Sequence, residues 1–283
     1  MDHPVPHRDV KPRRVTFRHP VGTRFQHYVD GDLIMSHAVA VLSGTFPEGE
    51  AFFVRSVRDL RHRVTDAELK AQVAGFIGQE VTHGREHQEL NEVLADMGYR
   101  SVKVDRHVRR LLGFVDRTSS RLQRLAVTAA LEHYTATIAE VLLENPEAQR
   151  LLGDSDVRSL LLWHALEESE HKAVAFDVYR AAGGPEWLRI LIMRTTTAIF
   201  ILEVLAHTGL SMLRDRATYN PGTLLRSFRA LWRSPFLQRS VWRRLNSYNR
   251  RGFHPDDWDA SELIAHWQAE LFGDQGTLTD HLR

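Results

Sequence analysis

Apolar residues recur every three or four positions through most of the sequence after Asp32, and this periodicity limits the fold more than any other feature. No run of alternating apolar and polar residues is long enough to predict a β-sheet. The predicted class is therefore all-α. The spacing predicts helices at residues 33–43, 47–62, 66–97, 118–144, 154–181 and 186–214, with shorter helices at 222–233 and 236–249.

Residues that start or stop helices mark several of these boundaries. Gly44 and Pro47 predict a break between the first two helices, with Pro47 in the opening turn of the second. Gly98 is a typical stop for the helix at 66–97, and Asp154 or Ser155 is the predicted cap of the helix at 154–181. Long helices with short connections are the ingredients of an antiparallel four-helix bundle.

Prolines at positions 4, 6, 12 and 20 predict that residues 1–30 form an extended N-terminal arm. Residues 31–184 then form the helical bundle, and residues 185–283 add C-terminal helices packed on it. A chain of 283 residues with 43% hydrophobic content can bury one sizeable core. The polar first residues lack the apolar stretch of a secretory signal, which favours a cytoplasmic protein.

Two predicted helices carry carboxylates and imidazoles on the face that otherwise holds apolar residues. On the helix at 66–97, this face carries Glu80, His83 and His87. On the helix at 154–181, it carries His164, Glu168 and His171. Burying such groups without partners destabilises a protein, and metal coordination compensates them. Because the chain has no cysteine, its metal ligands must be imidazole and carboxylate, which suit iron, manganese or zinc.

The pairs Glu80 with His83 and Glu168 with His171 have the Glu-x-x-His spacing of dimetal bundles, which take one further glutamate from each of the other two helices. Glu50 shares a helix face with apolar residues, and Glu132 lies among small residues that leave room for ions. These two are the candidates for the remaining ligands.

His87 and His164 are either additional ligands or groups that hold the ligands by hydrogen bonds. Glu86, Glu167 and Glu170 lie off these faces and are expected to be solvated or salt-bridged, although Glu167 replaces Glu168 if the helix is rotated slightly.

The motifs FPEGEAFF, QEVTHGREH, LEHYTA and WHALEESEHKAVAFDVY, with FHP near the carboxyl end, resemble a ferritin-like bacterial family described as predicted metal-dependent hydrolases. The resemblance spans roughly residues 30 to 260. It implies a ferritin-like four-helix bundle whose metal ligands are Glu50, Glu80, His83, Glu132, Glu168 and His171.

The first functional hypothesis is a dimetal oxidoreductase, an oxidase or oxygenase. A diiron or manganese–iron pair would activate dioxygen to oxidise an apolar small molecule, and zinc is less favoured. The similarity to ferritin-like oxidases implies this reaction type. The alternative is a metal-dependent hydrolase of an ester or phosphoester, for which the same ligands would serve. A further alternative is a non-catalytic iron-binding bundle.

The C-terminal helices suggest further contacts. Glu203 and His207 share a face of the helix at 186–214 and are candidates for the substrate channel. Residues 211–254 carry ten arginines against the single acid Asp215. This segment either packs on the bundle or meets anionic lipid at the inner face of the membrane. Nucleic acid is disfavoured because no binding motif accompanies the charge. The sequence is compatible with a homodimer.

Overall fold

Helices make up nearly all the regular structure in the computed structural model, which describes residues 6–17, 19, 25–152 and 156–283. The predicted all-α class is confirmed, since the described residues contain no β-strand and only one isolated bridge, between Val15 and Leu282. The inner helices are α1 (Leu33–Leu60), α2 (Ala67–Asp96), α4 (Arg121–Glu144), α6 (Asp156–His171) and α7 (Val174–Ala181).

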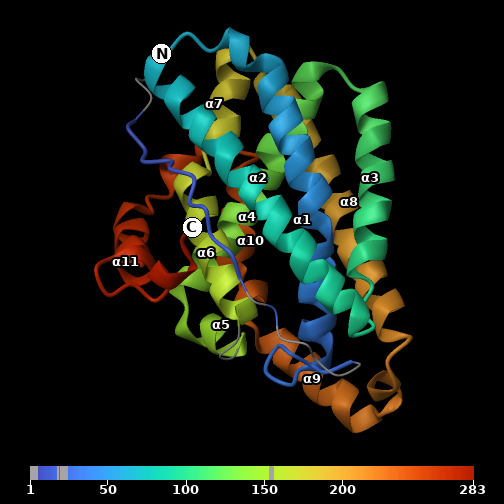
Figure 1. Ribbon diagram of the computed structural model, residues 1–283. Helices are drawn as coiled ribbons and strands as arrows, with labels where there is room; N and C mark the ends of the chain where they lie inside the picture. The colour runs from blue at the N-terminus through green and yellow to red at the C-terminus, as the bar shows by residue number, and fades with distance from the viewer. Residues whose placement is uncertain (1–5, 18, 20–24, 153–155) are drawn as a thin grey trace.

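These inner helices run side by side along the length of the molecule (Figure 1). Helix α1 packs against α2 and α4, and both α6 and α7 pack against α2 and α4. The outer helices are α3 (Ser101–Thr118), α5 (Pro146–Leu151), α8 (Glu186–Met212), α9 (Pro221–Arg233), α10 (Arg239–Ser247) and α11 (Ser261–Phe272). Figure 1 shows α3 and α11 on opposite sides of the inner helices. None of the described helices is both long and apolar enough to cross a membrane.

Helix α1 runs without interruption through Gly44 and Pro47, so the predicted break there is wrong. Proline has no N–H to donate to the carbonyl oxygen of Ser43, four residues earlier. That oxygen accepts a hydrogen bond from Asn91 Nδ2 of α2 instead, at 2.9 Å. At Gly44, an added Cβ would lie 2.7 Å from the carbonyl oxygen of Ser101, so glycine allows the start of α3 to approach. Both helix breakers therefore serve contacts between helices.

Other boundaries differ from the prediction in smaller ways. The helix predicted at 154–181 is divided, because α6 ends at His171 and α7 begins at Val174. Its proposed caps, Asp154 and Ser155, lie outside the described residues. Helix α4 starts at Arg121, three residues later than predicted, after a Ser120 capping box. Helices α3 and α11 were not predicted. Among their apolar residues, α3 buries only Val104 and Leu112, and α11 buries only Trp267 and Leu271.

The apolar core is divided along the helix axes into two clusters. Phe52 of α1, Phe76 of α2 and Leu125 of α4 belong to the first cluster. Leu90 of α2 and Leu142 of α4 belong to the second. On each of these helices the positions between the two clusters hold polar groups. The inner helices thus enclose a polar layer between two apolar ones.

Residues 6–17 of the N-terminal arm lie without helical structure against α2 and α6, whereas residues 28–31 form turns, so the predicted extended conformation is wrong near residue 30. An added Cβ at Gly75 would overlap the carbonyl oxygen of Val10, and one at Gly78 would overlap the ring of Pro12. The two glycines of α2 therefore let the arm lie directly on the helix backbone.

The arm also meets the C-terminal segment. Thr16 N donates to the carbonyl oxygen of His281 at 3.1 Å, and Arg283 N donates to the carbonyl oxygen of Arg14 at 2.8 Å. The Arg13 guanidinium lies 5.0 Å from the ring centroid of Phe272, at the end of α11. Two chain segments that are remote in sequence therefore cover the same side of the inner helices.

Candidate metal centre

The polar layer contains all six side chains that the sequence predicts as metal ligands. They are Glu50 of α1, Glu80 and His83 of α2, Glu132 of α4, and Glu168 and His171 of α6. None of the six exposes more than 3% of its surface, so they are not solvated surface groups. The structure brings all of them to one place, whereas their role as ligands stays a prediction.

The carboxylate of Glu168 lies at the centre of the group. Its Oε1 is 2.9 Å from His164 Nε2, 3.5 Å from His83 Nδ1 and 3.5 Å from His171 Nε2. Three imidazoles from two helices thus face one carboxylate oxygen. This position suits a carboxylate shared between two ions.

The other carboxylates surround the same imidazoles. His171 Nε2 lies 3.1 Å from Glu80 Oε1 and 3.4 Å from Glu132 Oε2. His164 Nε2 lies 3.6 Å from Glu50 Oε1. Glu50 has space because residue 84 of α2 is glycine, where an added Cβ would come within 3.2 Å of Glu50 Oε2.

Most ligand atoms of these side chains are buried without a hydrogen-bond partner among the described residues. Nine atoms share this property: both carboxylate oxygens of Glu50, Glu80 and Glu132, together with Glu168 Oε2, His83 Nδ1 and His171 Nε2. Native interiors contain few such atoms, because each costs the free energy of its lost hydration. Oxygen and nitrogen donors that converge in this way fit iron, manganese or zinc ions. The residues therefore fit a metal centre.

Electrostatics point in the same direction. Burial, followed by repulsion from the Glu80 carboxylate, raises the pKa of Glu50 and of Glu132 well above its ordinary value. Burial opposes ionisation of Glu168 as well, but the adjacent His171 holds the pKa of this carboxyl well below its usual range. Several close carboxylates cannot all ionise without cations. Divalent ions would remove this imbalance.

Each histidine of the Glu-x-x-His pairs makes a hydrogen bond through the ring nitrogen that faces away from the centre. His83 Nε2 donates to Glu167 Oε2 at 3.0 Å, and His171 Nδ1 donates to Gln79 Oε1 at 2.9 Å. These bonds direct His83 Nδ1 toward Glu168 and His171 Nε2 toward Glu80 at the centre. Burial alone would lower the pKa of His83, but the hydrogen bond to Glu167 contributes to raising it to about 10. Histidine ligands of metals are commonly oriented by such partners.

Arg13 of the N-terminal arm joins the two supports. Its guanidinium donates to Glu167 Oε1 at 3.0 Å and to both carboxylate oxygens of Glu170, at 2.6 and 2.8 Å. Gln79 Nε2 in turn donates to Glu170 Oε2 at 2.8 Å. One arginine therefore supports both histidines, through Glu167 on one side and through Glu170 and Gln79 on the other.

Sequence reasoning missed this outer layer. Glu86, Glu167 and Glu170 are buried, so the expected solvation is wrong, whereas the expected salt bridges exist, to Arg85 and to Arg13. Every residue from 162 to 176 is buried, and a helix buried all round shows no polar face from which its orientation can be read. The signal available in the sequence was the acidic run EESE between apolar residues.

His164 and His87 occupy successive positions behind the carboxylates. His164 Nδ1 lies 2.7 Å from His87 Nε2, and His87 Nδ1 lies 2.9 Å from Ser43 Oγ. Because a carboxylate oxygen only accepts, His164 Nε2–H donates to Glu168 Oε1 at 2.9 Å, and the neutral His164 ring accepts at Nδ1 from His87 Nε2–H. Burial lowers the pKa of His164 to about 4, which keeps it neutral. Glu50, His87 and His164 form one group whose possible ligand atoms lie within 4.8 Å of one another, so for both histidines the choice between ligand and support stays a prediction.

Residues 11–259 match the family described as predicted metal-dependent hydrolase. The chain belongs to this family. The match includes Arg13, the six clustered side chains, Gln79, His87 and His164. No curated protein and no solved structure matches the chain significantly.

The predicted substrate-channel residues lie at a different place within the region matching the hydrolase family. Glu203 Oε2 is 3.0 Å from His107 Nε2 of α3 and 3.2 Å from His207 Nε2. A second group joins His27, His37 and Asp215, whose Oδ2 lies 2.8 and 3.2 Å from the two imidazoles. The channel role of Glu203 and His207 stays a prediction.

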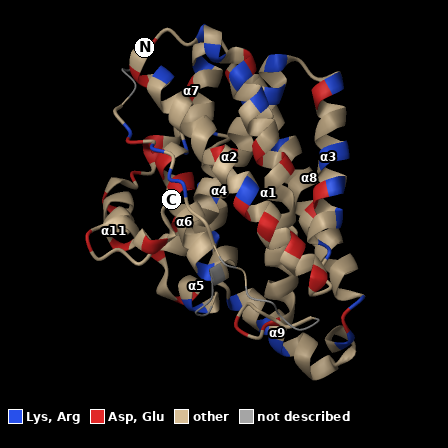
Figure 2. Cartoon of the chain, in the orientation of Figure 1, with Lys and Arg blue, Asp and Glu red and all other residues tan. Residues whose placement is uncertain are grey.

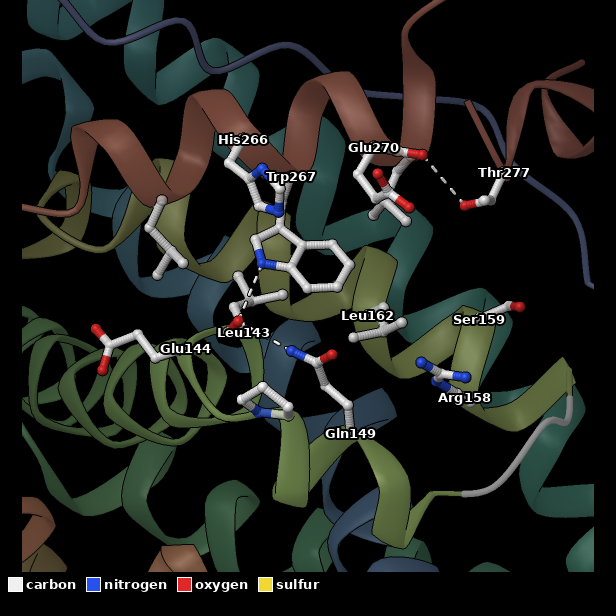
Figure 3. A pocket seen from close by; sticks show the side chains of 13 residues that line it. Leu143, Glu144, Gln149, Arg158, Ser159, Leu162, His266, Trp267, Glu270 and Thr277 are labelled. Carbon is white, nitrogen blue, oxygen red and sulfur yellow. Dashed lines mark hydrogen bonds between the residues drawn. The ribbon is translucent and has the colours of Figure 1, made fainter. Parts of the chain in front are cut away.

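A cavity of about 920 Å³ lies between the end of α4, α5, the first half of α6 and α11. Figure 3 shows Trp267 and Gln149 directed toward Leu143, whose carbonyl oxygen accepts hydrogen bonds from both at 3.1 and 3.0 Å. The lining mixes leucines with polar groups such as Arg158 and Glu270. None of the clustered side chains lines this cavity. Its α11 wall also lies beyond the residues matched to the hydrolase family.

Proposed function

We propose that the chain is a dinuclear metal enzyme and that it hydrolyses an ester or phosphoester. The observation that carries the metal centre is the convergence, from four inner helices, of nine buried oxygen and nitrogen atoms that have no hydrogen-bond partner among the described residues. The family description favours hydrolysis as the reaction. Two divalent ions at these residues would acidify a bound water and polarise the bond to be broken.

The protein's own residues would bind and orient. Glu168, central among three imidazoles, and Glu80, beside His171, would hold the two ions. Glu50 and Glu132 would each bind one ion. His83 and His171 would each complete one ion, because Glu167 and Gln79 fix the ring nitrogens that face the centre.

The test is metal-dependent turnover of chromogenic esters and phosphoesters. Protein stripped of metal should be inactive, and loading with Zn²⁺ or Mn²⁺ should restore hydrolysis with two ions bound per chain. Glu168→Ala should lose both the ions and the activity. Glu147→Ala, a change at an exposed acid of α5, is the matched control and should lose neither. Fewer than one ion per chain after loading would contradict the proposal.

A second candidate function is activation of dioxygen for oxidation of an apolar substrate, with Fe/Fe or Mn/Fe ions. The specific observation in its favour is the donor set, with single glutamates on α1 and α4 and Glu-x-x-His pairs on α2 and α6. That set is typical of di-iron and di-manganese carboxylate proteins.

One experiment separates the two functions. Protein loaded anaerobically with Fe²⁺ and then exposed to oxygen should develop iron–carboxylate or iron–oxo absorption only if the centre activates dioxygen. An unchanged spectrum together with Zn²⁺-dependent ester hydrolysis would support the hydrolase. The reverse pair of results would support the oxidase. If apolar compounds accelerate the reaction of the Fe²⁺-loaded protein with oxygen, and small polar compounds do not, the result would support an apolar substrate.

A further inference from the structure

Helix α9 exposes three large apolar side chains to solvent. Trp232 is 76% exposed, Phe228 56% and Leu225 50%. The helix lies at one end of the molecule, beyond the ends of the inner helices (Figure 1). Clustered exposed apolar side chains usually mark an interaction site, because their exposure to water is unfavourable.

The three side chains form a defined face. At about 100° per residue, Leu225, Phe228 and Trp232 fall within a sector of about 60°. Arg226, Arg229 and Arg233, all exposed, fill the adjacent sector of similar width. We call these six residues the α9 face; Figure 2 colours Lys and Arg blue along the chain, α9 included.

The opposite side of α9 is fixed to the protein. Ser227 is buried, its hydroxyl accepts a hydrogen bond from Ile34 N at 2.8 Å, and it donates to Asp32 Oδ1. Leu231 packs on the second apolar cluster. The α9 face is therefore held outward on a rigid support and does not fold back onto the molecule.

Charge identifies the partner. The sequence has no aspartate or glutamate from residue 216 to residue 255, so the arginines of the α9 face have no acidic neighbours along the chain. A symmetric contact with a second copy through the α9 face would bring six of these arginines into one interface, and the face itself supplies no acid to pair with them. An anionic bilayer accepts both kinds of side chain, since its phosphates bind guanidinium groups and its acyl boundary receives Trp, Phe and Leu.

We propose that the α9 face binds the surface of a membrane containing anionic phospholipid. The bilayer is contacted and not crossed. Leu225, Phe228 and Trp232 enter the boundary between headgroups and acyl chains, and the three arginines bind lipid phosphates. This inference does not depend on which reaction the metal centre catalyses.

The test uses the full-length protein and sedimentation with phosphatidylcholine vesicles, with or without added phosphatidylserine. Binding should require the anionic lipid and fall as salt is raised. Trp232→Ala should weaken binding about tenfold and Arg229→Gln about fivefold. Trp232→Phe, which keeps an aromatic ring, should retain most of the binding.

Two matched controls address nonspecific effects. Trp187→Ala removes an exposed tryptophan of α8, and Arg110→Gln removes an exposed arginine of α3, so neither should change vesicle binding. Absence of binding to anionic vesicles, or equal losses in the controls, would overturn the proposal. So would sedimentation velocity showing a dimer that Trp232→Ala dissociates, which would assign the α9 face to self-association.

Discussion

Replacing Arg13 by glutamine should weaken metal binding although Arg13 is not itself a ligand. The guanidinium makes three hydrogen bonds to Glu167 and Glu170, which support His83 and, through Gln79, His171. Loss of an outer partner commonly weakens metal binding about 10- to 100-fold. Because two buried carboxylates also lose their cation, we expect the metal-free protein to lose about 3 kcal/mol of stability.

The assay is competition for Zn²⁺ with a chromophoric chelator, below the unfolding temperature, with circular dichroism to verify the helices. Arg8→Gln is the matched control. Arg8 anchors the same arm through Asp177 and Asp256 but contacts neither Glu167 nor Glu170. It should reduce stability and leave Zn²⁺ affinity nearly unchanged. Parent-like Zn²⁺ affinity in Arg13→Gln, or an equal loss in Arg8→Gln, would refute the reasoning.

Three further outcomes are expected. Glu132→Ala should lose one ion and keep the other. Elemental analysis showing loss of both ions would contradict the proposal that Glu132 binds a single ion. Gly75→Val should displace the arm at Val10, which faster proteolytic cleavage of residues 6–17 would show; cleavage at the parent rate would mean that the arm tolerates the side chain. Burial is the main cause that lowers the pKa of His37, so the unfolded chain binds this proton first and stability should fall below about pH 6.5. His37→Gln should flatten that fall, measured by unfolding midpoints at about pH 5 and 7, while His62→Gln, at an exposed histidine, should not.

Sequence patterns predicted the inner helices and the convergence of the six clustered side chains, because both follow from spacing within single helices. Glu80 and His83 are three residues apart on α2, as are Glu168 and His171 on α6, and helical geometry places each pair on one face. The two pairs lie at the same level along the helix axes once α2 and α6 pack side by side.

The outer layer could not be predicted in the same way. Arg13 lies more than 150 residues from Glu167 and Glu170, and no local periodicity relates them. The continuity of α1 was hidden for a similar reason, because Pro47 is tolerated through a contact with Asn91 on another helix. Local sequence rules describe the backbone conformation that a residue favours or disfavours by itself. Contacts with residues distant in the sequence decide whether the chain adopts that conformation.

The cover over the centre is made of the N-terminal arm and the C-terminal segment, and neither carries a proposed ligand. The hydrogen bond between His281 and Thr16 joins positions 265 residues apart. Detachment of the arm would break these contacts but none of those that α1, α2, α4 and α6 make with one another. Ion exchange should then proceed at the rate of this local opening, far faster than global unfolding. Ions could be replaced within the lifetime of one folded molecule, so the metal it carries would follow the ions available around it.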